Sequence, residues 1–335
     1  MGILIIELVT GGGEYLTGPS AEFSETLIRE GRAMRDCVAR QLAQASDQVI
    51  RVFTSANRID GLEAGNESRV DSLHLTDAQS FWRELQRHSL SNDWSILLIA
   101  PESDGWLEKL TSKVEAWGGK LLSPDSSFVQ LCADKTRTVQ ALDKAGVPTA
   151  ANSIARPEAW MIKPRFGCGS EEIQRMAGNN PPSPVEYPRD HWHVEPWVPG
   201  LPASVCCVAN GEHQIFLPPF TQSFSPDLPK VYLGGEMVQD RNRIERLYNL
   251  ARMAIRGLPP TRGYFGIDML LGDLEEQDVV LEVNPRITTS WVGLAACLGN
   301  QLAEALLNPH AVASTTLVPR NLNIRFSADG HITRA

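Results

Sequence analysis

The chain has 335 residues, of which 42% are hydrophobic and 21% are charged, and its formal net charge is −9 at pH 7. This composition is typical of a soluble globular protein, and the length allows two or three compact units with their own cores. The excess of acidic residues, 40 against 31 basic ones, argues against nucleic-acid binding as the main function. No apolar segment is long enough to span a bilayer.

The six cysteines are scattered along the chain, and they form neither a CxxC pair nor a Cys/His set with the spacing of zinc ligands. The apolar start, residues 3–9, is short, contains Glu7 and lacks a basic flank, so it predicts a first strand rather than a signal peptide. Scattered cysteines without a secretion signal are typical of the reducing cytoplasm. We therefore expect a cytoplasmic protein with no membrane partner.

The first third of the chain alternates between strand and helix patterns. Buried strands are expected at residues 3–8, 49–54, 94–100 and 120–122, and helices at residues 24–44, 78–87 and 105–116. This alternation predicts a parallel sheet covered by helices, in a domain that spans residues 1–120. Ligands bind beyond the carboxyl ends of such strands, which makes Gly12, Gly13 and Glu102 candidates for a substrate pocket. Turns without any ligand are the alternative for the two glycines.

A new unit is expected to begin at residue 121, because Ser123 and Pro124 predict the cap and the first position of a helix. Further on, Asp134 is the expected cap of another helix, which leaves Lys135 in its first turn. A cation in a first turn opposes the helix dipole, and an anionic ligand nearby would explain it. A solvated surface lysine is the alternative.

A short buried strand that ends in Lys163 leads into a loop with Gly167, Gly169 and Ser170. The glycines allow backbone N–H groups to turn towards an anion, while the lysine supplies a charge and the serine a hydroxyl. The loop therefore predicts phosphate binding, although the lysine precedes the glycines and the order is not that of a P-loop. An ordinary turn is the alternative.

The rest of the chain favours antiparallel strands with covering helices. Strands are expected at residues 192–198, 204–208, 214–217 and 231–233, and helices at residues 242–256 and 293–307. A polar, proline-rich connection precedes the first of these strands. We therefore divide this part into a small lobe at residues 121–190, a large lobe at residues 191–310 and a tail at residues 311–335.

Two apolar runs, residues 264–271 and 278–284, are joined by a polar link that predicts a hairpin. If the hairpin is symmetric about this link, Asp268 pairs with Glu282, and Asn284 lies on the same face. Opposed carboxylates repel each other unless a cation compensates them, and three oxygen donors suit Mg²⁺ that is bound together with phosphates. A solvated acidic face at a sheet edge is the alternative.

This order of parts resembles the ATP-grasp superfamily over residues 125–305. The residues that carry the resemblance are Lys135, Lys163 with its glycine loop, residues 194–200, Asp268, Glu282, Asn284 and Arg286. It implies a two-lobed ATP-grasp fold after the N-terminal parallel α/β domain, so the expected fold class is α/β and α+β. Shorter stretches resemble the tyramine–glutamate ligases of methanofuran biosynthesis, at residues 30–34, 100–104, 234–236 and 284–289.

The resemblance implies a role for each matched group. Two lysines would hold the α- and β-phosphates of ATP, and the glycine loop would close over them. The hinge strand between the lobes would read the adenine edge with its backbone, while a tryptophan covers the ring. Mg²⁺, with Mn²⁺ as the alternative, would bind the hairpin. The nucleotide set is Lys135, Lys163, Gly167, Gly169, Ser170, Glu195, Trp197 and Val198, and the metal set is Asp268, Glu282 and Asn284.

Two positions depart from the pattern of the superfamily. Pro202 stands where many relatives hold the ribose with a glutamate, which leaves Ser204 or Glu195 as the substitute. Peptide-ligase relatives carry an arginine two residues before the metal-binding aspartate, where this chain has a glycine. Arg286, or else Arg262, would then stabilise the transferring phosphoryl group, and Arg286 and Lys163 are the expected catalytic residues.

The resemblance implies an ATP-dependent carboxylate–amine ligase that forms an amide through an acyl phosphate and releases ADP and phosphate. The expected acyl donor is an amino acid such as glutamate, and the expected acceptor is a small amine such as tyramine. The alternatives are another amino-acid or dipeptide ligase and a non-catalytic ATP-binding sensor or scaffold. A homodimer is left open. Further candidate substrate residues are Gln222, Gly234, Gly235 and Thr288, the last with helix capping as an equal explanation.

Overall fold

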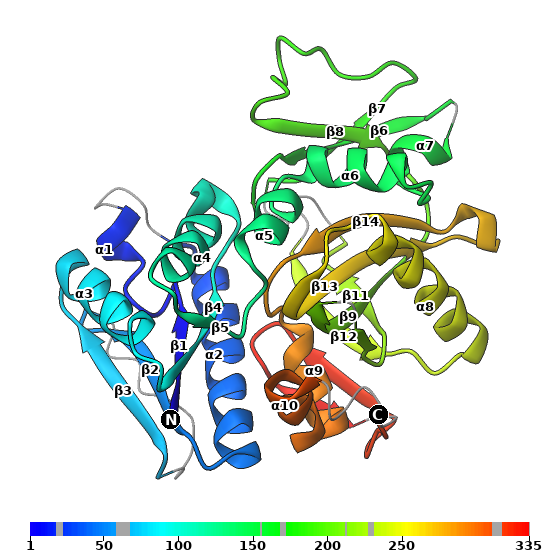
Figure 1. The fold of residues 1–335 in the computed structure, drawn as a ribbon. Coiled ribbons are helices and arrows are strands. Elements are labelled where there is room, and N and C mark those ends of the chain that lie inside the picture. Colours follow the sequence, from blue (N-terminus) through cyan, green and yellow to red (C-terminus); the bar gives the residue numbers. More distant parts are fainter. Residues whose placement is uncertain are drawn as a thin grey trace.

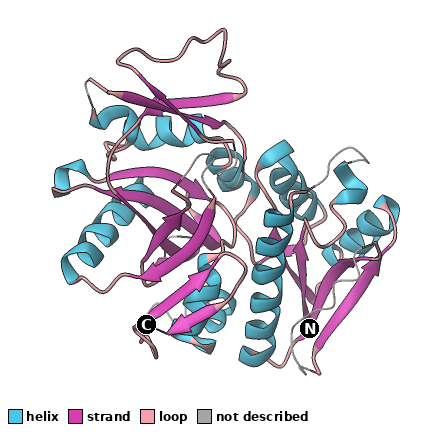
Figure 2. Ribbon diagram, turned by 180° about the vertical axis from the view of Figure 1, so that it is seen from behind, coloured by secondary structure: helices cyan, strands magenta, loops and turns pink. Residues whose placement is uncertain are grey.

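The structure is a computed structural model that describes residues 1–17, 23–57, 68–154, 156–167, 172–211, 213–226, 231–309 and 317–334. Its described strands form a parallel sheet of five strands, an antiparallel sheet of three and an antiparallel sheet of eight, and helices cover each of them (Figure 1). This architecture confirms the predicted mixture of α/β and α+β. Seen from behind, the small sheet lies above the large one, and the parallel sheet lies beside it (Figure 2).

The parallel sheet forms the N-terminal domain, with the strand order β3-β2-β1-β4-β5. Its strands are β1 (Gly2–Glu7), β2 (Val49–Ser55), β3 (Val70–Leu75), β4 (Trp94–Ile99) and β5 (Lys120–Leu121), and its helices are α1 (Glu14–Thr17), α2 (Glu25–Ala45), α3 (Ala78–Ser89), η1 (Ser103–Gly105) and α4 (Trp106–Ala116). The sequence predicted all of these strands except β3. This strand lies at the sheet edge and is only partly buried, so it lacks a continuous apolar run.

The central strand β1 is apolar because both of its faces are covered. Ile3 and Ile5 belong to a core with α2, whereas Leu4 and Ile6 belong to a core with α3 and α4. The helix ends follow local signals, since the hydroxyl of Ser24 accepts a hydrogen bond from a backbone N–H in the first turn of α2.

The small lobe contains the three-stranded sheet, in the order β7-β6-β8. Its strands are β6 (Ala159–Pro164), β7 (Gln174–Ala177) and β8 (Trp192–Pro196), and its helices are α5 (Ser126–Cys132), α6 (Lys135–Lys144) and α7 (Ala150–Ser153). Asp134 caps α6 by accepting a hydrogen bond from the backbone N–H of Arg137 at 3.1 Å, as the sequence predicted. This cap fixes Lys135 as the first residue of the helix.

The large lobe is built on the eight-stranded sheet, in the order β14-β13-β9-β11-β12-β15-β16 with β10 beside β9. Its strands are β9 (Leu201–Gly211), β10 (His213–Phe216), β11 (Phe220–Phe224), β12 (Tyr232–Met237), β13 (Thr261–Leu271), β14 (Val279–Asn284), β15 (Ile324–Ser327) and β16 (Ile332–Arg334), and its helices are α8 (Arg241–Arg256), η2 (Glu275–Gln277), α9 (Ser290–Leu298) and α10 (Asn300–Leu307). The predicted separate tail is therefore corrected, because β15 and β16 continue this sheet beyond β12. The other domain boundaries stay predictions.

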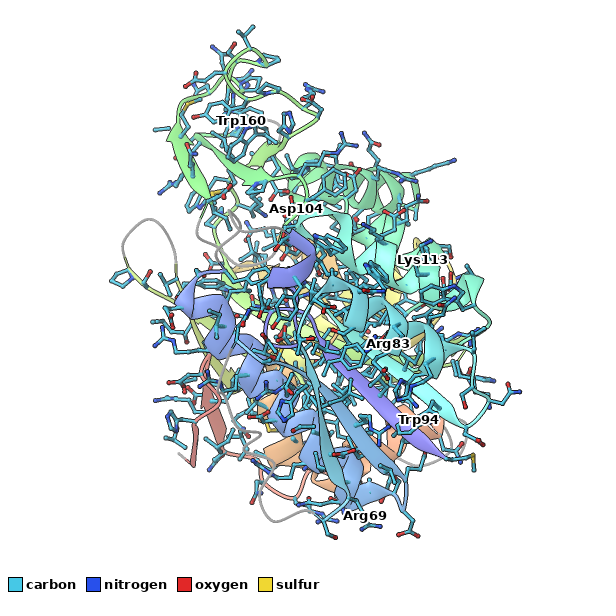
Figure 3. All side chains as sticks on the ribbon, turned by 90° about the vertical axis from the view of Figure 1, so that its left-hand side faces the viewer. Arg69, Arg83, Trp94, Asp104, Lys113 and Trp160 are labelled. Atoms are coloured by element: carbon cyan, nitrogen blue, oxygen red, sulfur yellow. The ribbon has the colours of Figure 1, made fainter. Side chains whose placement is uncertain are left out.

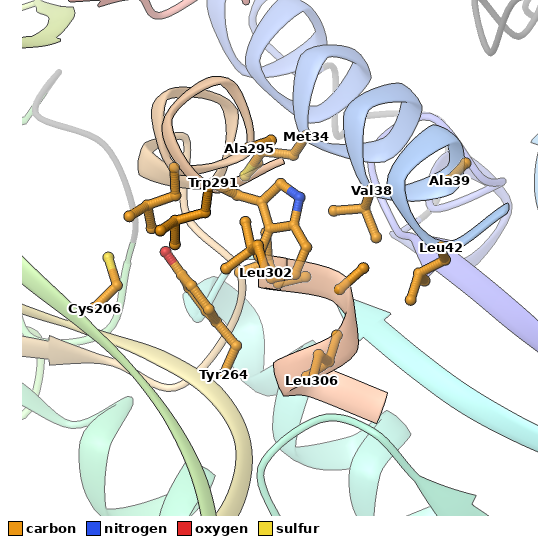
Figure 4. Close-up of a cluster of buried hydrophobic side chains, with 14 of the residues drawn as sticks. Met34, Val38, Ala39, Leu42, Cys206, Tyr264, Trp291, Ala295, Leu302 and Leu306 are labelled. Carbon is orange, nitrogen blue, oxygen red and sulfur yellow. The ribbon is translucent and has the colours of Figure 1, made fainter. Parts of the chain in front are cut away.

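A continuous apolar core joins the N-terminal domain to the large lobe (Figure 4). Trp291 of α9 is fully buried, and its ring lies 5.3 Å from the ring of Tyr264 of β13 in an edge-on contact. Met34 and Val38 of α2 belong to the same cluster. Because α2 packs against its own sheet on one side and against α9 and α10 on the other, it holds the two units together. None of the helices in the described ranges has the length and apolarity needed to cross a membrane.

Candidate active site

The hairpin of β13 and β14 brings the expected metal ligands together. Asp268 is the direct cross-strand partner of Glu282, and Asn284 is the partner of Gly266, so the three polar side chains share one face. The predicted pairing is thus confirmed. The register shifts directly after Asp268, where a bulge leaves Leu281 without a cross-strand partner. Leu281 lines the same cavity as the two carboxylates.

The two carboxylates of this hairpin are held in different electrostatic surroundings. Burial and the nearby charge of Glu282 raise the pKa of Asp268 to about 7, although Asn284 and Gln222 donate hydrogen bonds to it at 3.0 and 2.9 Å. Burial also acts on Glu282, but Lys135 and Lys163 lower its pKa overall. The Nζ atom of Lys135 lies 3.5 Å from a carboxylate oxygen of Glu282. Glu282 therefore keeps its charge beside the two lysines, whereas Asp268 is protonated more readily than an ordinary aspartate.

This donor set fits a hard divalent cation. No group of three or more His, Cys, Asp or Glu side chains in the described residues could hold a metal ion. The candidate ligands on this face are two carboxylates and an amide. Such a set leaves coordination positions for water and phosphate oxygens, as Mg²⁺ requires. A cation would also relieve the repulsion that raises the pKa of Asp268. The metal-binding role of Asp268, Glu282 and Asn284 stays a prediction that the geometry supports.

Two lysines approach the hairpin from the small lobe. Lys163, near the end of β6, forms a buried ion pair with Glu195 of β8, and His193 contacts the other oxygen of Glu195 at 3.2 Å. Burial alone would lower the pKa of Lys163, but Glu195 and Glu282 raise it, so the ammonium charge is retained. Lys135 donates a hydrogen bond to the backbone carbonyl of Gly167 at 2.7 Å. The predicted Gly169 and Ser170 lie outside the described residues.

Glu195 and Val198 of the hinge strand pack within the protein. Glu195 is 1% exposed and its carboxylate pairs with Lys163, and Ser204 is also buried. Val198 packs in a small core with Ala150 and Val279. The role of Glu195 or Ser204 as the substitute ribose ligand stays a prediction.

Trp197 and Arg175 form a further contact at the hinge. The guanidinium of Arg175 lies 3.9 Å from the ring centroid of Trp197, a cation–π arrangement. Trp197 is only half-buried, and its backbone N–H donates a hydrogen bond to the carbonyl of Ala159 at 2.9 Å. The expected stacking of this ring on adenine stays a prediction.

Arg286 lies beside the metal ligands and is held by the N-terminal domain. Its guanidinium donates two hydrogen bonds to the carboxylate of Glu102, at 2.9 and 3.1 Å, and Glu102 is 3% exposed. Such a bidentate pair fixes the orientation of the guanidinium. The sequence suggested Glu102 as a substrate residue, but in the structure its carboxylate holds the guanidinium of Arg286. Arg262 is exposed on β13 and lines neither of the two site cavities, which leaves Arg286 as the arginine of the site.

Two adjoining hollows meet at Lys163 and Glu282. The first, of about 170 Å³, contains the metal ligands and Arg286, and the second, of about 710 Å³, extends past Lys135 to the N-terminal domain. Figure 3 shows Asp104, which lines the second hollow, at the end of the N-terminal domain nearest the small lobe. The predicted residues of the first hollow are Lys163, Gln222, Asp268, Glu282, Asn284, Arg286 and Thr288, and those of the second are Lys135, Lys163, Gly167 and Glu282.

The glycines suggested as substrate contacts line neither of these hollows. A Cβ atom on Gly13 would lie 2.5 Å from the carbonyl oxygen of Leu8, and one on Gly234 would lie 2.0 Å from that of Phe326. Gly235 is similarly close to a neighbouring strand, and Gly12 has a φ of +98°. Close backbone packing and turn geometry therefore account for Gly12, Gly13, Gly234 and Gly235, and the structure does not place them against a substrate.

The first hollow is also lined by residues that were not singled out as site residues, among them Glu30, Met34, Phe224 and Tyr232. Glu30 and Met34 lie on α2. Phe224 is the last residue of β11, and Tyr232 is the first residue of the paired strand β12. Their types are common in any amphipathic helix or sheet. For Glu30 and Met34, one signal could have found them, namely the stretch at residues 30–34, which resembles the ligase family.

The sequence matches two families of domains. Residues 132–290 match the ATP-grasp domain, and residues 50–129 match the pre ATP-grasp 3 domain. Over 305 residues the chain is 22% identical to the tyramine–L-glutamate ligase of Methanocaldococcus jannaschii, an alignment that covers 91% of this chain and 90% of that protein.

Solved structures with the same architecture include an ATP-grasp superfamily protein from Archaeoglobus fulgidus. Its TM-score is 0.68 at 21% identity, and the alignment covers 92% of this chain and 88% of that one. The L-amino acid ligase from Bacillus licheniformis has a TM-score of 0.63 at 13% identity, with 91% of this chain and 74% of that chain covered. At these identities the likeness shows a shared fold.

Proposed function

Since the chain belongs to the ATP-grasp superfamily, we propose that it is a carboxylate–amine ligase that forms an amide through an acyl phosphate and releases ADP and phosphate. One observation carries the proposal: two lysines, two opposed carboxylates and a clamped arginine converge on adjoining hollows. These groups match what phosphoryl transfer requires, namely positioning and the neutralisation of developing charge. The groups are Lys135, Lys163, Asp268, Glu282 and Arg286.

The residues of the small lobe would bind the phosphates of ATP. Lys163 keeps its ammonium group charged within the protein because Glu195 and Glu282 raise its pKa against the effect of burial, and the ion pair with Glu195 holds its position. Lys135 lies at the start of α6, and its contact with the carbonyl of Gly167 connects it to the loop that follows β6. A divalent cation held by Asp268, Glu282 and Asn284 would supply further charge neutralisation between the phosphate oxygens.

Arg286 would stabilise the transferring phosphoryl group. A carboxylate oxygen of the donor attacks the γ-phosphorus of ATP, the bond between this phosphorus and the bridging oxygen breaks, and ADP leaves with that oxygen. The acceptor, as a neutral amine, then attacks the carbonyl carbon of the acyl phosphate, phosphate leaves with the electrons of the C–O bond, and the nitrogen releases a proton to give the amide. Because Glu102 fixes the guanidinium of Arg286 from the N-terminal domain, the arginine needs no reorganisation when charge develops.

We propose glutamate as the acyl donor and tyramine as the acceptor. The support is the relative from Methanocaldococcus jannaschii, whose alignment covers nearly the full length of both chains. A second candidate is the ligation of two amino acids, which the fold shared with the L-amino acid ligase supports. A non-catalytic nucleotide sensor is disfavoured, because such a protein would not need the opposed carboxylates together with both lysines.

The test is ADP release by the purified full chain with ATP and Mg²⁺, against a panel of amino acids and amines. We expect ADP formation that depends on both an acid and an amine, with amide product detected by mass spectrometry. Mn²⁺ in place of Mg²⁺ should also support turnover. ATP binding without any substrate-dependent ADP release would establish a sensor and refute the ligase.

A further inference from the structure

The end of the first hollow away from the small lobe is built by two separate parts of the chain. Glu30 and Met34 lie four residues apart on α2 and so share a face of that helix. Phe224 and Tyr232 are cross-strand partners on β11 and β12, and their rings meet edge to face at a centroid distance of 5.7 Å. We call these four residues, Glu30, Met34, Phe224 and Tyr232, the acceptor wall.

The acceptor wall is continuous with the metal-binding hairpin. Tyr232 lies within the electrostatic influence of both Asp268 and Glu30, and after burial these two carboxylates contribute to its raised pKa. Gln222 of β11 connects the two regions directly, because its side chain donates a hydrogen bond to Asp268 at 2.9 Å. A ligand on the wall would therefore lie next to the place where an acyl phosphate forms.

The chemistry of the acceptor wall differs from that of the phosphate site. The phosphate site contains the cations Lys163 and Arg286, whereas the only ionisable groups of the wall are the carboxyl of Glu30 and the phenol of Tyr232. The other surface is a thioether and an aromatic ring, which favour an apolar ligand body. A carboxylate beside apolar and aromatic surface suits a ligand that combines a cation with a hydrophobic body.

We propose that the acceptor wall selects an amine that lacks a carboxylate of its own. Its ammonium group pairs with Glu30, whose carboxylate takes a proton from it so that the neutral amine can attack, and its aromatic or aliphatic body lies against Met34, Phe224 and Tyr232. This inference rests on the proposed function, since it assigns the acceptor half of that reaction. An amino-acid acceptor would bring a second carboxylate close to Glu30, and like-charge repulsion disfavours it. The wall thus favours amine ligation over dipeptide formation.

Two acceptors that differ by a single carboxylate test the inference, namely tyramine and tyrosine. Hydroxylamine, a small uncharged nucleophile, serves as a separate trap for the acyl phosphate. For the wild type we expect kcat/KM for tyramine to exceed that for tyrosine at least about tenfold. Glu30→Gln should lower kcat/KM for tyramine by about 10- to 100-fold, mainly through KM, and should narrow the tyramine-to-tyrosine ratio.

Glu25→Gln is the matched control, because Glu25 lies on the same helix, is exposed and lines neither hollow of the site. It removes the same charge and should leave the acceptor ratio at the wild-type value. Phe224→Leu provides a second variant in case Glu30→Gln does not fold. It should raise KM for tyramine severalfold more than KM for ethanolamine, which has no aromatic body.

The outcomes separate the acceptor wall from the ligase itself. A Glu30→Gln variant with the wild-type acceptor ratio, or with equal losses for tyramine and hydroxylamine, would overturn the role of the wall. An unchanged preference in Phe224→Leu would also count against it. If the wild type forms no hydroxamate with any acid in the panel, the ligase proposal fails before any acceptor is considered, and the wall falls with it.

Discussion

At the hairpin of β13 and β14, Asp268 faces Glu282 across the strands, and burial together with this opposing charge raises the pKa of Asp268. At the end of β1, the carboxylate of Glu7 is more deeply buried, but it accepts hydrogen bonds from the backbone N–H groups of Val9 and Thr10 and from the hydroxyl of Thr10. Ligands were expected both at this hairpin and in the loop that follows β1.

The difference shows what distinguishes a ligand site from a structural turn. The carboxylate of Glu7 is satisfied by its own loop, and Gly31 of α2 leaves the space that it occupies. The hairpin instead opposes two carboxylates that line a cavity, and a bound cation would relieve the repulsion between them. Opposed carboxylates that line a cavity therefore mark a site more reliably than glycines in a loop do.

The largest effect is expected for Glu282→Ala. Removing one of the two opposed carboxylates should lower turnover by about a thousandfold or more, because the cation loses an anionic ligand. The measurement is steady-state ADP release at saturating Mg²⁺. Glu276→Ala, at an exposed position of the same hairpin, is the control and should retain the wild-type rate. A Glu282→Ala variant with wild-type turnover would refute the site.

Lys163→Met tests the buried ion pair of the small lobe. It leaves the carboxylate of Glu195 without its main partner, so the free energy of unfolding should fall by about 3–5 kcal/mol, and ATP binding should weaken. Urea denaturation and calorimetric titration with ATP measure the two effects. In the double variant Lys163→Met/Glu195→Gln, stability should largely recover while ATP binding stays weak. Recovery of both would mean that Lys163 serves the fold alone.

Gly234→Ala tests whether the glycines of β12 serve packing. The added Cβ would meet the carbonyl oxygen of Phe326, and the φ of +126° is already unfavourable, so we expect a loss of about 3 kcal/mol in the free energy of unfolding. Gly178→Ala is the matched control, because its φ is +137° but nothing lies within 4 Å of the new atom. It should cost about 1 kcal/mol. Equal losses in thermal unfolding would show that backbone strain, and not packing, is the cause.

The smallest expected effects concern the pH dependence of stability. The pKa of Glu195 is lowered in the folded protein, whereas that of Glu7 is raised. Burial tends to raise the pKa of Glu195, but Lys163 and His193 lower it to about 2. Its folded pKa is thus below the ordinary value of 4.5, so its contribution to stability is present above pH 4.5 and is lost as the pH falls towards 2. Glu195→Gln should remove this dependence, at most about 1.4 kcal/mol per pH unit.

For Glu7, burial outweighs the hydrogen bonds from Thr10 and raises the pKa. Its contribution is therefore present below the ordinary value of 4.5 and is lost as the pH rises through the folded pKa. Glu7→Gln should flatten that limb of the stability profile, measured by urea denaturation from about pH 3 to about pH 8, a range of about five pH units that includes the ordinary value. If both variants flatten the same limb, the contrast between the two carboxylates is wrong.

The prediction from sequence succeeded where neighbours along the chain decide the outcome. The pairing of Asp268 with Glu282 follows from a short link and the period of the strands, and the cap of α6 follows from Asp134 directly before the helix. The sequence did not predict β3, because this edge strand is half-exposed and shows no apolar run. It could not assign the glycines, because the same residue serves a turn, a close contact or a ligand.

The amino-acid sequence by itself determined the order of elements and the opposed carboxylates, since these depend on local periodicity and residue chemistry, and the resemblance to a family added ATP as the expected ligand of the two lysines. Only the tertiary structure decided that Glu102 holds Arg286 from 184 residues away and that Glu195 is occupied by Lys163. It also decided that α2 contributes Glu30 and Met34 to the cavity, because its packing against α9 and α10 places that helix against the large lobe. Contacts between distant segments depend on how whole domains pack, and no pattern within either segment contains that information.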